Sequence, residues 1–309
     1  MSRNWVVKNL GQYSAERIRE VVNMLQLSPE LFLEWAGKVA RLKMHPYFTI
    51  ADFAVMCMVV RDDLSTGANA FSRKHPFATW MSSMLMCFAG SFLANFIMGE
   101  PVITPFKRQE DVLLATIVWY FIFYSPMDIC YKFGKFFPVN LVLLLMKEIY
   151  RAYKVQAGVL HAAKAYPNAV IVMVMVGTAK GAGAGIVRTV EQLVRGVWAP
   201  GHNEFLRPTF YTKACILASI VFVLEKKSPY LSAYPHEIIY FTIVAFFVYF
   251  KLNAIFFHIH DPFGPFENLF CALFMGGIWD ALSRAIQASR ERRAAAQAAG
   301  GEGETKKEL

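Results

Sequence analysis

The apolar residues of this chain fall into blocks of roughly twenty, separated by proline, glycine and charged clusters. A helix of about twenty apolar residues crosses the hydrocarbon core of a bilayer. Inside that core every backbone polar group must find a partner within the protein, and a helix provides one through its own hydrogen bonds. The composition agrees, since only 18% of the residues are charged, against about a quarter in soluble domains. We therefore predict an all-α polytopic membrane protein.

Seven transmembrane helices are predicted from these blocks, and they define a transmembrane domain over residues 47–257. They cover residues 47–60, 77–98, 112–131, 136–160, 169–193, 209–224 and 238–257. Seven helices place the two termini on opposite sides of the membrane. The loop distribution of Lys and Arg favours a lumenal N-terminus and a cytosolic C-terminus.

Two segments flank this domain. Residues 1–46 form a polar arm, in which Ser28-Pro29-Glu30 predicts the start of an amphipathic helix. Residues 258–287 form a juxtamembrane segment. Within it, residues 266–286 form either an eighth span or a helix in the membrane interface, and their scattered charges favour the interface.

The end of the chain has a different composition. Residues 288–309 are mostly Ala, Gly, Glu, Lys and Arg, and we expect a disordered cytosolic tail. Its last residues, Lys306-Lys307-Glu308-Leu309, resemble a retrieval signal of the endoplasmic reticulum. The first apolar block begins near Tyr47, which is too late for a cleavable signal peptide.

Several function classes find no support in the sequence. The net charge of +9 comes without the aromatic-interleaved basic motifs of nucleic-acid modules, so lipid headgroups are the expected anions. Neither a nucleophile elbow, nor a phosphate loop, nor an HExxH motif is present, and we expect no enzyme activity. The five cysteines lack metal-ligand spacing, and we expect no metal site at His258, His260 and Asp261.

The fourth predicted helix carries an unusual set of charges. Lys147, Arg151 and Lys154 share one helix face, and Glu148 can pair with Arg151. A charge at the centre of a bilayer costs at least about 2.5 kcal/mol. These cations therefore require a water-filled cavity or an anionic partner. The alternative is that they lie beyond the membrane and extend their side chains to its surface.

Lys180 lies inside a glycine-rich stretch of the fifth predicted helix. The glycines are Gly177, Gly181, Gly183 and Gly185. Glycine permits a kink, a close approach of a neighbouring backbone, or both. The spacing also fits close packing of small residues between helices, but packing alone leaves Lys180 without a role. We therefore favour a pore or gating role for this stretch.

Gly90 lies at a similar depth in the second predicted helix. If helices one to three and four to six are repeats, their odd number inverts the second repeat against the first. The second and fifth helices then become symmetry mates, each broken by glycine at mid-membrane, and a seventh helix is added. Asp128, near the end of the third helix, is either a carboxylate that attracts cations or a counter-ion for Lys132.

One segment of the fourth helix resembles a family signature. Residues 147–155 read Lys-Glu-Ile-Tyr-Arg-Ala-Tyr-Lys-Val and are similar to the motif of trimeric intracellular cation channels. Further matches include His75-Pro76, Gly99-Glu100-Pro101, Pro126-Met127-Asp128, Lys180-Gly181-Ala182-Gly183, Arg195-Gly196-Val197-Trp198 and Pro262-Phe263. The resemblance covers roughly residues 45–275 and indicates an invertebrate-like member of this family.

The resemblance implies a homotrimer with one pore in each protomer, in the endoplasmic or sarcoplasmic reticulum, with the nuclear envelope as an alternative. It implies a potassium channel that balances charge when calcium-release channels empty the store. It also implies that Lys147 and Arg151, with Lys154, hold the headgroup of phosphatidylinositol 4,5-bisphosphate. The glycines at 90 and 177–185 correspond to the pore-lining kinks of the family.

Two other functions stay open at this point. A secondary transporter or anion carrier built on the same inverted repeat would use the basic residues to bind substrate. A seven-helix receptor fits the count and orientation, but it lacks a DRY-like end to the third helix and an NPxxY motif in the seventh.

Overall fold

The computed structural model describes most of the chain and divides it into two units, Met1–His258 and Ile259–Leu309. The described residues are 29–64, 67–197, 204, 206, 208–228, 231, 234–257 and 261–304. All regular elements in this part of the chain are helical. The all-α prediction is therefore confirmed for the described residues.

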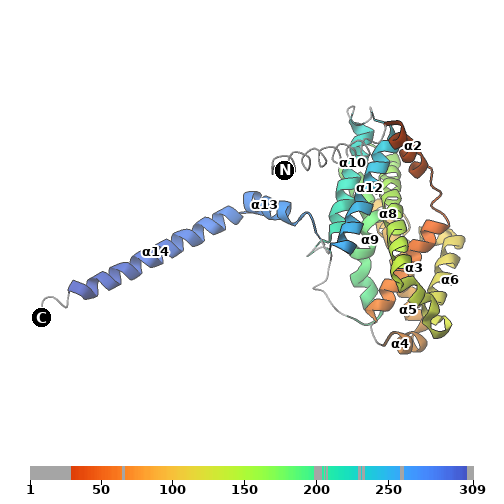
Figure 1. Ribbon diagram of the computed structural model, residues 1–309, viewed down its shortest axis with the longest axis horizontal. Helices are drawn as coiled ribbons and strands as arrows, with labels where there is room; N and C mark the ends of the chain where they lie inside the picture. Colours follow the sequence, from red (N-terminus) through yellow and green to blue (C-terminus); the bar gives the residue numbers. More distant parts are fainter. Residues whose placement is uncertain are drawn as a thin grey trace, which may run out of the picture. The chain divides into compact units, whose positions relative to one another are not determined.

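The described part of the first unit contains ten α-helices and two short 3-10 helices (Figure 1). They are α2 (Pro29–Ala40), α3 (Tyr47–Asp63), α4 (Ala68–Lys74), α5 (Pro76–Met98), η2 (Thr104–Lys107), α6 (Gln109–Tyr124), η3 (Pro126–Asp128), α7 (Ile129–Lys135), α8 (Phe137–Ala165), α9 (Val170–Val194), α10 (Phe210–Lys227) and α12 (His236–Phe256). The second unit contains α13 (Gly264–Phe274) and α14 (Gly277–Glu304).

The ends of α5 show how local chemistry sets a helix. Pro76 occupies the first turn, where its missing N–H removes no helical hydrogen bond. At the other end Gly99 takes the left-handed conformation, with φ of 73°, which costs glycine little. The N–H of Glu100 then donates to the carbonyl of Asn95 at 2.9 Å. This closes the helix where the sequence predicted its end.

The third predicted span is interrupted where its proline lies. Ser125, which precedes Pro126, is extended with ψ of 141°, because proline disfavours the helical conformation of its predecessor. Beyond this point the segment Pro126–Lys135 is bent by 91° from Gln109–Tyr124.

Membrane-crossing length can be assessed for the described helices alone. α5, α9 and α12 are each long and apolar enough to cross a bilayer, and the number rises to five if each of two bent helix pairs counts as one span. α3 falls short in length, with 17 residues, and α8 fails by composition, because it carries the charged face predicted above. The count of seven therefore remains a prediction.

Helix packing in the first unit follows two groups of three. α3 contacts α5 and α6, and α8 contacts α9 and α10, while α5 and α9 pack extensively against each other. An apolar core, which includes Phe88 and Phe123, fills the first group. α8 also contacts α3 and α12, so it lies at the centre of this bundle (Figure 1). α2 begins at Pro29, as predicted, and packs on α12.

Two expectations differ from the structure. The expected break at mid-membrane is not found in α5 or α9, since each runs through its glycines as one continuous helix. The tail expected to be disordered is helical as far as Glu304, because alanine, glutamine, glutamate and arginine are strong helix formers. Residues 305–309, which include the whole retrieval-like signal, lie outside the described part, as do His258 and His260.

Candidate functional site

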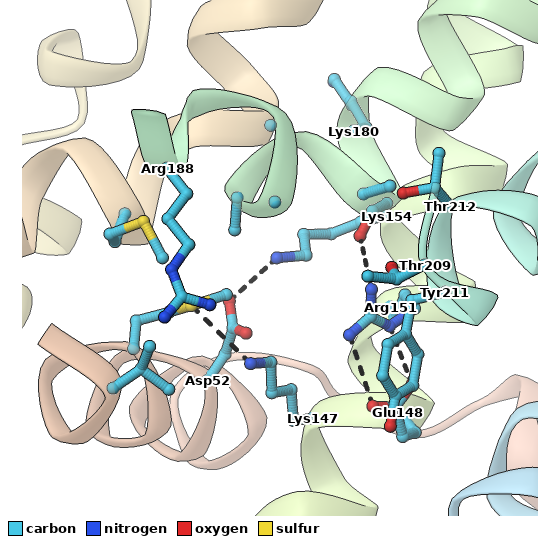
Figure 2. Close-up of a pocket in the computed structure, with 18 of the residues that line it drawn as sticks. Asp52, Lys147, Glu148, Arg151, Lys154, Lys180, Arg188, Thr209, Tyr211 and Thr212 are labelled. Carbon is cyan, nitrogen blue, oxygen red and sulfur yellow. Dashed lines mark hydrogen bonds and ion pairs between the residues drawn. The ribbon is translucent and has the colours of Figure 1, made fainter. Parts of the chain in front are cut away.

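A cavity of about 270 Å³ lies among α3, α5, α8, α9, α10 and α12 (Figure 2). We call it the basic cavity. Its charged lining consists of six basic side chains, Lys147, Arg151, Lys154, Lys180, Arg188 and Lys251, and three acidic ones, Asp52, Glu148 and Glu204. The formal balance is therefore three positive charges in excess.

Arg151 has the partner that the sequence predicted. Its guanidinium donates to the Glu148 carboxylate, with Nε 2.8 Å from Oε2 and Nη2 3.3 Å from Oε1. Nη1 also donates to the carbonyl of Gly181 on α9 at 3.0 Å. The guanidinium lies 4.6 Å from the ring centroid of Tyr211 on α10. Arg151 thus links three helices, and its charge is already neutralised by Glu148.

Lys154 has a partner that the sequence did not reveal. Its Nζ lies 2.9 Å from Oδ2 of Asp52, across the interface between α8 and α3. Asp52 is 1% exposed, so this ion pair is buried. Asp52 interrupts an apolar block of the sequence, and an acid in such a block is a signal that a basic partner lies opposite.

Lys147 is the member of this face without a carboxylate partner among the described residues. Its ammonium group contacts the Met56 sulfur at 3.7 Å, which is a weak acceptor. Within the same part of the chain Lys180 also lacks an ion pair. The predicted need for a water-filled cavity or an anionic partner is met inside the protein for two of the three α8 cations, since Arg151 and Lys154 each pair with a carboxylate.

The opposite wall is built from the start of α10 and from α12. Lys251 donates to the Tyr211 hydroxyl at 2.8 Å, so Tyr211 contacts both Lys251 and Arg151. The Glu204 carboxylate accepts hydrogen bonds from the Thr209 N–H at 2.9 Å and the Thr212 hydroxyl at 2.8 Å. It satisfies the N-terminus of α10, a position that favours negative charge. Sequence reasoning missed these contributions, because they come from side chains roughly 40 to 90 positions beyond the end of α8.

A second cavity of about 350 Å³ adjoins the first. We call it the mixed cavity, because three acidic side chains and three basic ones line it together with His161. These are Asp52, Glu100 and Asp111, and Arg108, Lys154 and Lys180. Asp52, Cys87, Lys154 and Lys180 line both cavities. The two cavities therefore meet at the Asp52–Lys154 ion pair, and Lys180 borders both.

The predicted glycines bring helices together. A Cβ atom on Gly183 would lie 2.5 Å from the Gly90 Cα, and one on Gly90 would lie 2.4 Å from the Lys180 carbonyl oxygen. Such distances exclude any larger residue without a backbone shift, so α5 and α9 cross at these glycines. A Cβ atom on Gly177 would likewise lie 2.6 Å from the Ser219 Oγ on α10.

Three of the predicted glycines also reach the site. Gly90, Gly181 and Gly185 line the basic cavity, whereas Gly177 and Gly183 line neither cavity. All five glycines are therefore closely packed, as the alternative from the sequence proposed. Only three of them also line a cavity.

Asp128 lies away from both cavities. Its carboxylate pairs with Arg61 at 2.8 Å and accepts a hydrogen bond from Asn69 at 3.1 Å. The expected counter-ion role toward Lys132 is corrected, because Arg61 takes that place. Arg61 is only 4% exposed, so burial favours a close carboxylate partner for it.

Comparisons with known proteins agree with this geometry. The sequence model of the TRIC channel family matches residues 65–258. The trimeric intracellular cation channel type 1B.1 of Caenorhabditis elegans is 62% identical over 275 residues, which is 89% of this chain and 93% of that protein. Type 1B.2 of the same organism is 50% identical and covers 85% of this chain and 83% of its own length.

Solved structures give the same result. A trimeric intracellular cation channel from C. elegans with bound Ca2+ superposes with a TM-score of 0.71 at 60% identity, and covers 75% of this chain and all of its own. A structure described as the basis for activity of TRIC counter-ion channels in calcium release gives a TM-score of 0.68 at 33% identity, and covers 73% of this chain and 99% of its own.

Proposed function

Because this chain belongs to the TRIC channel family of trimeric membrane cation channels, and is not an enzyme, we propose that it is a potassium channel of the endoplasmic or sarcoplasmic reticulum. It supplies counter-ion current while calcium-release channels empty the store. Each protomer holds one pore, associated with phosphatidylinositol 4,5-bisphosphate. The counter-ion role is supported by a 33% identical relative described in those terms.

The observation that carries the proposal is the meeting of two polar cavities inside one protomer. The basic and mixed cavities share four lining residues, and their boundary is the buried Asp52–Lys154 pair. A potassium ion that crosses from one cavity to the other has to pass this pair and Lys180. We assign the gate to this boundary. Separating the Asp52 carboxylate from the Lys154 ammonium would open a polar connection between the two cavities.

Lys147 supports the lipid part of the proposal. This ammonium lacks a carboxylate partner among the described residues, and the cavity around it has three positive charges in excess. A phosphorylated headgroup would supply the missing negative charge. Lys147 and Arg151 are positioned to donate to phosphate oxygens. Lys154 has a smaller share, because Asp52 already engages it.

The fold supports a topology of two inverted three-helix repeats, α3–α6 and α8–α10, with α12 as the seventh helix. The two groups make matching contacts, and their middle helices, α5 and α9, cross at Gly90 and Gly183. The N-terminus is lumenal and the C-terminus cytosolic in this topology.

A planar-bilayer recording tests the function directly. The purified protein is placed in a bilayer that contains the phosphoinositide, with a gradient of potassium chloride across it. Unitary steps with a reversal potential near the potassium equilibrium value are expected. A reversal near the chloride value contradicts the proposal.

An anion carrier is the second candidate, and the excess positive charge of the basic cavity favours it. The same preparation separates the two functions. A carrier gives saturable, substrate-specific uptake without single-channel steps, whereas the channel gives steps without saturation by a single substrate.

A further inference from the structure

The helix α13 has one strongly apolar face. Successive residues rotate by about 100° around a helix, which places five large apolar side chains on one side and Glu267, Asn268 and Cys271 on the other. The apolar set is Phe266, Leu269, Phe270, Leu273 and Phe274, each between 51% and 71% exposed. A face of this kind needs a partner that is itself apolar.

The first half of α14 repeats the pattern. Trp279, Leu282 and Ile286 lie within a narrow arc of the helix, and all three are exposed. Arg284 lies off that arc, whereas Arg290 follows Ile286 by one turn on the same side of the helix, and both arginines are exposed. The sequence continues with Arg292 and Arg293, so basic residues accumulate directly after the apolar ones.

The chain itself indicates what covers this surface. α12 is a candidate membrane span that ends at Phe256, and only residues 257–263 separate it from α13. Such a connection reaches at most roughly 30 Å, so a lipid surface lies within reach of α13. The segment follows the part of the chain that the channel family matches, residues 65–258, so the pore domain of the family does not account for it.

We propose that α13 and residues 279–291 of α14 lie in the interface of an anionic phospholipid membrane. The apolar faces enter the acyl boundary, and the arginines contact lipid phosphates. A bent span through the bilayer is the weaker reading, since it would carry Glu267, Asp280 and Arg284 into hydrocarbon. This inference does not depend on which ion the protein conducts.

Residues on the two faces of α13 make the test specific. The full-length protein is reconstituted in phosphatidylcholine vesicles, with or without about one phosphatidylserine in three lipids. One variant keeps the native Cys271 on the polar face and carries Cys130→Ser. The other carries Phe270→Cys with Cys130→Ser and Cys271→Ser, which places the thiol on the apolar face. An environment-sensitive fluorophore on each thiol is quenched by aqueous iodide or by lipids that carry a quencher at known depth.

The label at position 270 is expected to be roughly fivefold less accessible to iodide than the label at position 271, and to be quenched by shallow lipid quenchers. Equal iodide access at both positions overturns the proposal. Shielding of position 270 without lipid quenching also overturns it, because protein then covers the face. Quenching of both labels by deep quenchers overturns it in favour of a bent span.

The arginines are tested separately. Arg284→Gln with Arg290→Gln should remove the additional shielding of position 270 that phosphatidylserine gives, and should leave the value in phosphatidylcholine unchanged. Arg73→Gln with Lys74→Gln on α4 removes the same charge elsewhere and should have no effect. If the two double variants behave alike, the assignment of anionic lipid to this surface is wrong.

Discussion

The two cavities share a wall but differ in how their charges are balanced. In the mixed cavity each carboxylate has a basic neighbour: Asp52 pairs with Lys154 at 2.9 Å, Glu100 with His161 at 2.9 Å and Asp111 with Arg108 at 3.0 Å. Among the side chains that line the basic cavity, positive charges exceed negative ones by three, and Arg188 is engaged by Asp63 outside the lining at 2.7 Å. Lys147 has no acid partner among the described residues.

The difference indicates where an anion can bind. The mixed cavity holds as many carboxylates as Lys and Arg side chains, and each carboxylate is engaged, so it has no excess positive charge for an added phosphate, although Lys180 makes no ion pair among the described residues. The basic cavity contains an uncompensated ammonium beside a guanidinium, and an added phosphate would complete it. We therefore expect the basic cavity to hold a bound anion, and both cavities together to form the path of the conducted ion.

Disrupting the Asp52–Lys154 ion pair at the boundary between the cavities should have the largest effect on stability. Asp52→Asn leaves Lys154 buried without its partner, and we expect a loss of stability of about 3–5 kcal/mol. Asp62→Asn on the same helix is the matched control, because its pair with Lys135 is solvent-exposed and contributes less than about 1 kcal/mol. Thermal unfolding of the purified protein measures both variants, and equal losses would remove the special role of the boundary.

A change confined to the basic cavity should come next. Lys147→Gln removes the ammonium that lacks a carboxylate, and a charge-assisted hydrogen bond contributes about 1.5–3 kcal/mol. Affinity for phosphatidylinositol bisphosphate should fall at least about tenfold in a binding assay with the purified protein. Arg108→Gln, which lies in the mixed cavity, should leave the affinity unchanged. Similar losses from both variants would show that the cavities do not differ in anion binding.

The crossing of α5 and α9 should tolerate little added volume. Gly183→Ala places a methyl group 2.5 Å from the Gly90 backbone, and overpacking of this kind costs about 1–3 kcal/mol. Gly37→Ala on α2 meets no atom within 4 Å and should be neutral or stabilising by up to about 1 kcal/mol. Thermal unfolding distinguishes the two, and a stable Gly183→Ala protein would show that the crossing is not tight.

The smallest effect is expected in the mixed cavity. Glu100→Gln removes a carboxylate that is 37% exposed and paired with His161, so its contribution is less than about 1 kcal/mol. The reversal potential in a potassium chloride gradient should move slightly toward the chloride value. Glu110→Gln on the exposed side of α6, outside both cavities, should not change it. A large shift from Glu110 would place cation selectivity outside the mixed cavity.

Local patterns predicted the helices well because their causes are local. The ends of α5 follow from Pro76 and Gly99, and the bend after α6 follows from Pro126. The shared face of Lys147, Arg151 and Lys154 follows from helical periodicity, as does the Glu148–Arg151 pair. The helix over residues 288–304 was not predicted, because the expectation of disorder rested on the low hydrophobicity of this segment and did not consider its helix propensity.

Contacts between helices were harder to predict, because they depend on which side chains packing brings together. Asp128 was assigned to the nearby Lys132, but Arg61 takes it. The glycines were predicted to allow a kink, a close backbone approach or both, and the structure shows the close approach between Gly90 and Gly183. In both cases the sequence singled out the correct residues. It could not show which residue of another helix each one contacts.

By itself the sequence determined an all-helical membrane protein, and its motif at residues 147–155 resembled the TRIC family. It also placed a row of cations on one face of the fourth helix and small glycines along the fifth, because residues four apart are neighbours within a helix. Only the tertiary structure decided which cations are already neutralised. Lys154 and Asp52 are 102 positions apart, and their contact exists because α3 and α8 pack side by side. Lys147 is then the cation on that face without a carboxylate partner in the part of the chain that the structure describes.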